Sequence, residues 1–138
     1  MTGEQEIVLN AVNCDDRGEI LHEMMHTVGF NHEHNRIDRD QYIKVNFLNI
    51  PLEWRNQYTA DEEWTFNSLG PYDFYSLMHY EIQSPDRKKP AFTILKDNVN
   101  ATLVGQRMFL SEIDKQKIRS LYCPTVGKEL LNSTLEEN

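Results

Sequence analysis

Histidine and glutamate residues gather in one short stretch of the chain. Residues 22–36 read HEMMHTVGFNHEHNR and contain four histidines and two glutamates. His22 and His26 are four residues apart, so on an α-helix with about 3.6 residues per turn both imidazole rings project from one face. Two imidazole nitrogens placed in this way can bind one zinc ion at about 2.0–2.1 Å each. The spacing predicts a metal site on a helix.

Glu23 adds a base to this pair. It follows His22 directly and falls beside the same helix face, where its carboxylate can reach a water on the metal without binding the metal itself. Zinc brings the pKa of such a water to about 7, and a nearby carboxylate can then take its proton. This combination predicts hydrolytic chemistry. A structural zinc site is the weaker reading, because such sites close with four protein ligands.

A third histidine follows a glycine. Gly29 can adopt positive φ and turn the chain sharply after the helix, so that His32 can return as a third ligand. The stretch HEMMHTVGFNH matches every specified position of H-E-x-x-H-x-x-G-x-x-H, the metzincin form of the zinc peptidase motif. The alternative, a polar helix without metal, is disfavoured by that match. His34 and His79 are expected outside the ligand set, because three histidines and water complete a tetrahedral site.

Local sequence signals predict one helix near the start of the chain and another near its end. Asp15 and Asp16 offer N-cap oxygens, and Glu19 would complete a capping box for a helix that runs to about Val28 and ends at Gly29. A last helix begins at Ser111, where Asp114 would complete a second capping box. The apolar positions of this last helix are Ile113, Ile118, Leu121 and Tyr122.

Strand signals are shorter and weaker. Gln5–Val12 and Tyr42–Phe47 are predicted strands, and Pro51–Tyr58 is predicted to form a helical turn that buries Trp54. The segment from Thr59 to Lys96 is rich in turn-forming residues and is predicted to be mostly irregular. We therefore expect one α+β domain over residues 1–123, followed by a polar tail over residues 124–138 that is expected to be disordered.

Composition excludes some function classes. The net charge of -8, from 14 basic and 22 acidic residues, argues against binding to nucleic acid backbones, which depends on Lys and Arg. No run of eighteen apolar residues is present, so no membrane span is expected. The first ten residues, MTGEQEIVLN, do not have the pattern of a signal peptide. The sequons at Asn100 and Asn132 give only weak support for secretion.

The chain resembles the astacin family of zinc endopeptidases from about Gly3 to Cys123. The resemblance is carried by HEMMHTVGFNHEHNRIDRD, by YDFYSLMHY and by GQRMFLSEIDKQKIRSLYC. It implies a zincin-like fold with an active-site helix and an irregular C-terminal lobe, one zinc ion, peptide or protein substrates, and secretion.

The resemblance also implies a role for each site residue. His22, His26 and His32 would bind zinc, and Glu23 would be the general base. Tyr80 would stabilise the oxyanion, and Met78 would form the Met-turn beneath the metal. Arg107 would face the pocket just beyond the scissile bond and favour acidic substrate residues, with an ordinary surface arginine as the alternative. The segment Asp86–Arg119 carries a net charge of +4 (eight basic and four acidic residues), which fits this role but also fits a solvated basic face.

Members of this family begin with a half-domain that the chain lacks, so the N-terminal sheet is expected to be truncated. Cys14 and Cys123 occupy positions whose family partners would precede Met1, and the resemblance therefore implies that they do not pair with each other and stay free. Glu33 would lose its family partner, the mature amino terminus, and is expected to be solvated. Two functions remain open: an active zinc endopeptidase, and a truncated zinc-binding fragment without catalysis.

Overall fold

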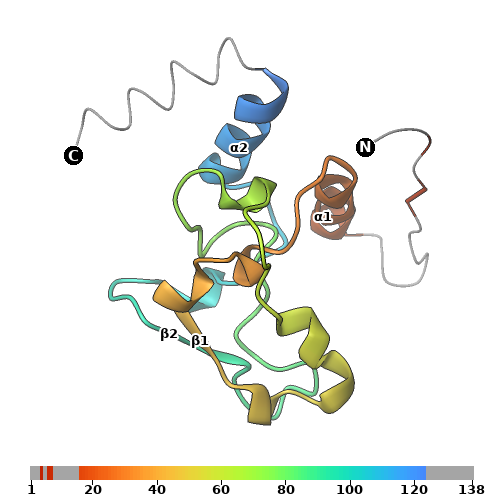
Figure 1. Ribbon diagram of the computed structural model, residues 1–138. Helices are drawn as coiled ribbons and strands as arrows, with labels where there is room; N and C mark the ends of the chain where they lie inside the picture. Colours follow the sequence, from red (N-terminus) through yellow and green to blue (C-terminus); the bar gives the residue numbers. More distant parts are fainter. Residues whose placement is uncertain (1–3, 5, 8–15, 124–138) are drawn as a thin grey trace.

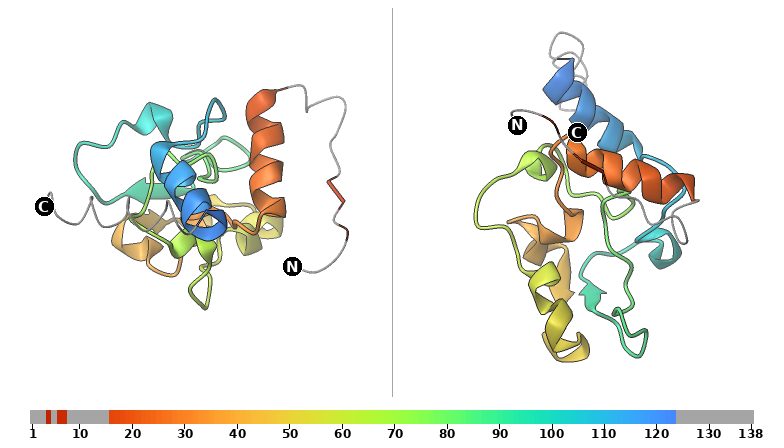
Figure 2. Two further views of the ribbon diagram at one scale, coloured as in Figure 1. Left: turned by 90° about the horizontal axis from the view of Figure 1, so that it is seen from above. Right: turned by 90° about the vertical axis from the view of Figure 1, so that its right-hand side faces the viewer.

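The computed structural model describes Glu4, Glu6, Ile7 and residues 16–123. These residues form an α+β fold, as predicted. The helices α1 (Arg17–Thr27) and α2 (Glu112–Tyr122) lie at one end of the molecule, and the strands β1 (Ile43–Val45) and β2 (Phe92–Ile94) lie toward the other (Figures 1 and 2). Short 3₁₀ helices connect them: Glu33–Asn35, Arg39–Gln41, Phe47–Asn49, Leu52–Tyr58, Phe66–Ser68 and Ala101–Leu103.

Helix α1 begins and ends where the local signals predict. Asp16 is the N-cap, and its side chain accepts a hydrogen bond of 2.8 Å from the backbone N–H of Gly18. Gly29 has φ of 93° and follows the last turn, where the N–H of Phe30 donates to the carbonyl of Met25 at 3.1 Å. The Glu19 carboxylate lies 3.6 Å from Nε of Arg107, so it pairs with a distant segment rather than with the cap.

Helix α2 carries the predicted capping box. Oγ of Ser111 accepts from the N–H of Asp114 at 2.9 Å, and the Asp114 carboxylate accepts from the N–H of Ser111 at 3.1 Å. Both residues also contact other segments, so this cap helps to fix the helix against the rest of the domain.

The sheet has two antiparallel strands, and its register pairs Ile43 with Ile94 and Val45 with Phe92. Strand β1 lies inside the predicted strand Tyr42–Phe47. Strand β2 lies inside the segment 59–96, which was predicted to be mostly irregular and in which this strand was not foreseen. The run Phe92–Ile94 is too short to stand out by itself, and its hydrogen-bonding partner is distant in sequence.

One local prediction was wrong. Trp54 is 45% exposed, whereas Tyr58 at the end of the same 3₁₀ helix is 1% exposed. The spacing within a short helix places only one of the two rings toward the core, and Tyr58 occupies that position.

Two hydrophobic clusters stabilise the fold. One surrounds the sheet and is formed by Ile43, Ile50, Tyr58, Ala91, Phe92 and Val104. The other joins the two α-helices: Met25 of α1, Phe30 and Met78 pack with Ile118 and Leu121 of α2. Met78, the predicted Met-turn residue, is 1% exposed at this junction. Because Tyr80 packs on the first cluster, the segment 78–80 contacts both.

Several predictions concern residues near the two ends of the chain. Cys14, the tail 124–138 and most of the predicted strand Gln5–Val12 lie outside the described residues. Cys123 is a free and exposed cysteine. No helix within the described ranges is long and apolar enough to cross a membrane.

Candidate metal centre

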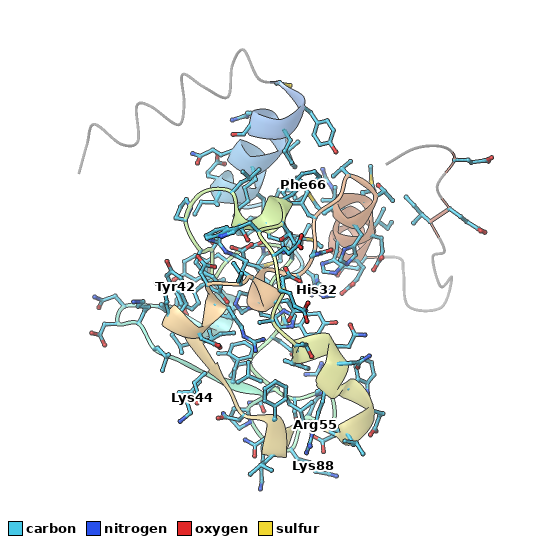
Figure 3. The ribbon with its side chains drawn as sticks, viewed as in Figure 1. His32, Tyr42, Lys44, Arg55, Phe66 and Lys88 are labelled. Carbon is cyan, nitrogen blue, oxygen red and sulfur yellow. The ribbon has the colours of Figure 1, made fainter. Side chains whose placement is uncertain are left out.

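Three histidine rings meet between α1 and the loop that follows it. One ring nitrogen from each of His22, His26 and His32 lies within 4.8 Å of the others, and Nε2 of His22 is 3.3 Å from Nε2 of His32. Donors about 2.0–2.1 Å from a tetrahedral zinc ion lie roughly 3.3 Å from one another. The structure thus brings together the three histidines that the motif predicts as ligands, and His32 lies near the middle of the molecule (Figure 3).

Backbone carbonyls orient two of the rings. Nδ1 of His22 donates to the carbonyl of Leu77 at 2.9 Å, and Nδ1 of His26 donates to the carbonyl of Phe30 at 2.8 Å. When Nδ1 carries the proton, the Nε2 lone pair is available to a metal, and such contacts commonly fix the tautomer of metal-binding histidines. The donor set therefore fits zinc.

Burial keeps two of these rings neutral. The pKa of His22 is lowered to about 4, chiefly by desolvation and also by the charges of Arg107 and His26, against the effect of the Leu77 hydrogen bond. Desolvation likewise lowers the pKa of His32 to about 3, with further contributions from His26 and His22. Neutral imidazole is the form that binds a metal, so the site is ready to bind at neutral pH.

Tyr80 lies against this centre. Its ring centroid is 4.4 Å from that of His32 and 4.1 Å from that of His34, on which it stacks. Burial raises the pKa of Tyr80, and Glu23 raises it too, while Arg107 opposes the shift. The phenol is therefore protonated at neutral pH and can donate a hydrogen bond. Glu23, partly buried on α1, is close enough for its charge to act on Tyr80.

A cavity of about 340 Å³ opens beside Tyr80. Its wall combines carboxylates, Glu19 and Glu81, with guanidinium groups, Arg87 and Arg107. The remaining lining residues are Trp54, Tyr58, Gln83, Pro85 and Gly105. Its mixed charge suits an extended polar chain better than a small apolar ligand.

Arg107 is anchored within this wall. Its Nη1 donates to the carbonyls of Leu77 at 2.9 Å and His79 at 3.0 Å, and its Nε lies 3.6 Å from Glu19. Burial lowers the pKa of Arg107, and Glu19 opposes that shift. The guanidinium thus ties the segment 77–79 to α1, a structural contact that the sequence did not indicate.

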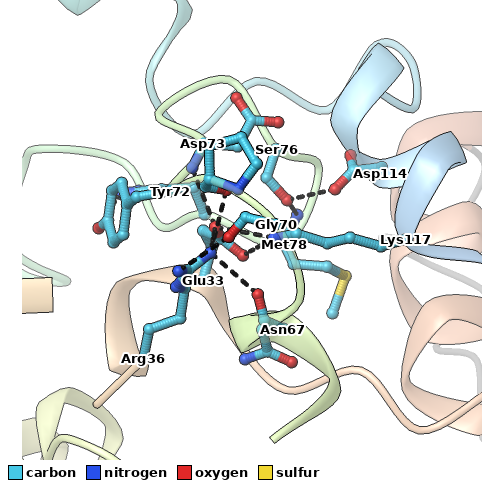
Figure 4. A network of polar contacts seen from close by, with 12 residues as sticks. Glu33, Arg36, Asn67, Gly70, Tyr72, Asp73, Ser76, Met78, Asp114 and Lys117 are labelled. Carbon is cyan, nitrogen blue, oxygen red and sulfur yellow. Dashed lines mark hydrogen bonds and ion pairs between the residues drawn. The ribbon is translucent and has the colours of Figure 1, made fainter. Parts of the chain in front are cut away.

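Glu33 contradicts the prediction that it is solvated. It is 1% exposed, and both of its carboxylate oxygens accept hydrogen bonds from Nζ of Lys117, at 2.9 and 2.8 Å (Figure 4). Arg36 Nη1 lies 3.1 Å from the same carboxylate. Burial raises the pKa of Glu33, while the charges of Lys117 and Arg36 oppose that shift. The prediction was wrong because α2 supplies a cation from 84 residues away.

Sequence reasoning also missed the buried charges of α2. Asp114, Lys117, Ile118 and Leu121 follow the i, i+3, i+4, i+7 spacing of a buried helix face. Two charged residues on that face would have signalled buried partners. His34 and His79 are fully buried, and among the described residues the metal-binding group contains only the other three histidines.

Comparisons with known proteins agree with this geometry. The family model Astacin, which describes a family of peptidases, matches residues 1–123. The chain is 40% identical over 131 residues to zinc metalloproteinase nas-15 of Caenorhabditis elegans, covering 94% of this chain and 22% of that protein. It is 40% identical over 127 residues to human Tolloid-like protein 2, covering 88% of this chain and 12% of that protein.

A solved structure supports the fold. High choriolytic enzyme 1, a hatching enzyme zinc-protease from Oryzias latipes (medaka fish), aligns with a TM-score of 0.67 and 33% identity over 76% of this chain and 52% of that one. The fold is thus that of a family of zinc peptidases, and the three-histidine cluster is compatible with their zinc ion. The chain belongs to the astacin family. It spans less than a quarter of the length of nas-15 and of Tolloid-like protein 2. Zinc is confirmed as the cofactor at the level of the family.

Proposed function

We propose that the chain carries the catalytic centre of a zinc-dependent metalloendopeptidase that hydrolyses peptide bonds. The observation that carries the proposal is the convergence of the nitrogens of His22, His26 and His32 within 4.8 Å, with Glu23 next to His22 on α1. Family membership adds support from an independent direction.

Each residue has a role that follows from its position. Zinc, when bound, supplies a Lewis acid and lowers the pKa of water to about 7. The three histidines would hold that ion through their ring nitrogens. Glu23 takes a proton from the attacking water and passes it to the leaving amine. Tyr80, protonated and next to His32, donates a hydrogen bond to the oxyanion that forms on the scissile carbonyl.

We propose that the substrate is an extended peptide or protein segment bound along the cavity beside Tyr80. Arg107 lies in the wall of that cavity, and the proposal gives it a preference for an acidic residue after the scissile bond. Its contacts with the Leu77 and His79 carbonyls and its ion pair with Glu19 at 3.6 Å hold it in place. Action outside the cell is part of the proposal and rests on the family resemblance.

The test uses the full chain and a peptide library. Loaded with zinc, the chain is expected to cleave peptides, and Glu23→Gln is expected to bind zinc normally while losing cleavage. Glu112→Gln serves as a matched control, because this exposed carboxylate pairs with Lys115 on α2 and does not line the cavity. Full zinc occupancy without Glu23-dependent cleavage would contradict the proposal. It would favour the alternative function, a fragment that binds zinc but does not catalyse.

A further inference from the structure

Helix α2 places two buried charges one turn apart against the metal centre. Asp114 is 1% exposed and Lys117 is 3% exposed. Acidic residues and lysines are almost never fully buried unless they are paired. Besides its capping bond to Ser111, Asp114 contacts the segment 76–77, and Lys117 contacts Glu33 (Figure 4). Leu77 of the first segment accepts a hydrogen bond from His22, and Glu33 directly follows His32 in the sequence.

Asp114 is linked to the first histidine. Its Oδ2 accepts from the N–H of Leu77 at 2.9 Å, and its Oδ1 accepts from Oγ of Ser76 at 2.6 Å. The carbonyl of the same Leu77 accepts the Nδ1–H of His22. One face of α2 thus holds Leu77, the residue whose carbonyl orients His22.

Lys117 is linked to the third histidine. Its Nζ donates to both oxygens of Glu33, the residue directly after His32. The same carboxylate accepts from Arg36 Nη1 at 3.1 Å and from the N–H of Asp73 at 2.9 Å, and the backbone N–H of Glu33 donates to the carbonyl of Met78 at 3.0 Å. Glu33 is therefore fixed by contacts to several separate segments of the chain.

His32 depends on such support more than its partners do. Carbonyls orient the rings of His22 and His26. In the described part of the chain, His32 is held mainly through its backbone: its carbonyl accepts from Nδ2 of Asn67 at 2.9 Å, and Glu33 anchors the next residue. Second-sphere contacts of this kind set the orientation of a metal ligand and its affinity.

We infer that Lys117 is a positioning residue for His32, acting through Glu33, so that α2 supplies the counter-ion on which the geometry of the third ligand depends. The inference rests on the proposed zinc site. Without Lys117, the Glu33 carboxylate would keep Arg36 but lose two hydrogen bonds in a buried place, and it would move toward solvent and carry the backbone of His32 with it.

The test measures zinc affinity of the full chain by competition with a chromophoric chelator, and ligand geometry by the visible spectrum of the cobalt(II) form. Lys117→Met is expected to weaken zinc binding about 10- to 100-fold and to change the cobalt spectrum. Lys117→Arg keeps the charge and is expected to restore most of the affinity. Lys115→Met is the matched control, because Lys115 lies on the same helix and, within the described residues, forms its ion pair with the exposed Glu112.

A double-variant cycle separates positioning from general stability. Glu33→Gln combined with Lys117→Met removes the uncompensated carboxylate, so the two losses of affinity are expected to be less than additive. If Lys117→Met does not fold, zinc affinity and the cobalt(II) spectrum are measured on this double variant and on Lys117→Arg instead. Urea unfolding of the metal-free proteins measures stability separately.

The outcomes are distinct. A Lys117→Met protein that is less stable in urea but has the zinc affinity and cobalt spectrum of the unaltered chain would show a purely structural role and overturn the inference. If the unaltered chain itself binds no zinc, the proposed function fails first. If the unaltered chain binds zinc and the affinity of Lys117→Met equals it, only the positioning role of Lys117 fails.

Discussion

At the residue scale, Tyr80 combines the properties that an oxyanion donor needs. Its ring is stacked on His34 and tilted against His32, so its position is set by packing. Burial raises the pKa of its phenol, which therefore keeps its proton at neutral pH. A donor that is already oriented stabilises developing charge without a cost of reorganisation.

Replacing this phenol tests the assignment. Tyr80→Phe keeps the ring stack but removes the donor, so we expect kcat to fall about 10²- to 10³-fold, with zinc affinity nearly unchanged. Steady-state kinetics on a cleaved peptide and a zinc titration measure the two effects. Unchanged kcat would remove Tyr80 from the mechanism.

At the element scale, α1 lies unusually close to the segment that carries Arg107. A Cβ atom built on Gly18 would lie 1.4 Å from the carbonyl oxygen of Arg107. The absence of a side chain at this position therefore allows the backbone of α1 to contact that segment directly. Because His22 follows one turn later, this contact helps to place the first zinc ligand.

Gly18→Ala is expected to destabilise the domain even though alanine favours helices. The added methyl group must push α1 away from Arg107, and overpacking of this kind costs about 1–3 kcal/mol or more. Urea unfolding of the metal-free protein measures it. Arg17→Ala, at an exposed position of the same turn, is the control and should stay within about 0.5 kcal/mol. Equal stability of the two variants would contradict the close contact.

Local signals were enough for some elements and not for others. The caps at Asp16 and Ser111 and the turn at Gly29 were predictable, because each is determined by residues within a few positions of it. Strand β2 and the burial of Glu33 were not, because each depends on a partner distant in sequence, such as Lys117. The histidine motif was predictable only in part. Its spacing is a local feature of the sequence, but the carbonyl that orients His22 belongs to Leu77, which is distant in sequence.

At the scale of the whole molecule, buried neutral histidines link stability to pH. Burial lowers the pKa of His79 to about 4, from 6.5 in an unfolded chain, and burial also lowers the pKa of His34 well below that value. Between pH 6.5 and 4 the unfolded state binds a proton at His79 that the folded state does not. The free energy of unfolding therefore falls as the pH is lowered through this range.

The contribution of His79 can be isolated by subtraction. Burial raises the pKa of Glu33 and Asp73, which gives contributions of opposite sign, so the useful quantity is the difference between the unaltered chain and His79→Gln. We expect the metal-free unaltered chain to lose up to about 1.4 kcal/mol more per pH unit between pH 6 and 5. Urea unfolding at each pH gives the slopes. Parallel slopes would show that His79 is not kept neutral by folding.

The central claim is that His22, His26 and His32 together bind zinc, and X-ray absorption at the zinc edge tests it most directly. The full chain loaded with one equivalent of zinc should show only nitrogen and oxygen neighbours at about 2.0–2.1 Å, with the multiple-scattering pattern of three imidazoles. His32→Ala should lose one imidazole from that pattern. A sulfur neighbour at about 2.3 Å, or a spectrum that His32→Ala leaves unchanged, would contradict the account.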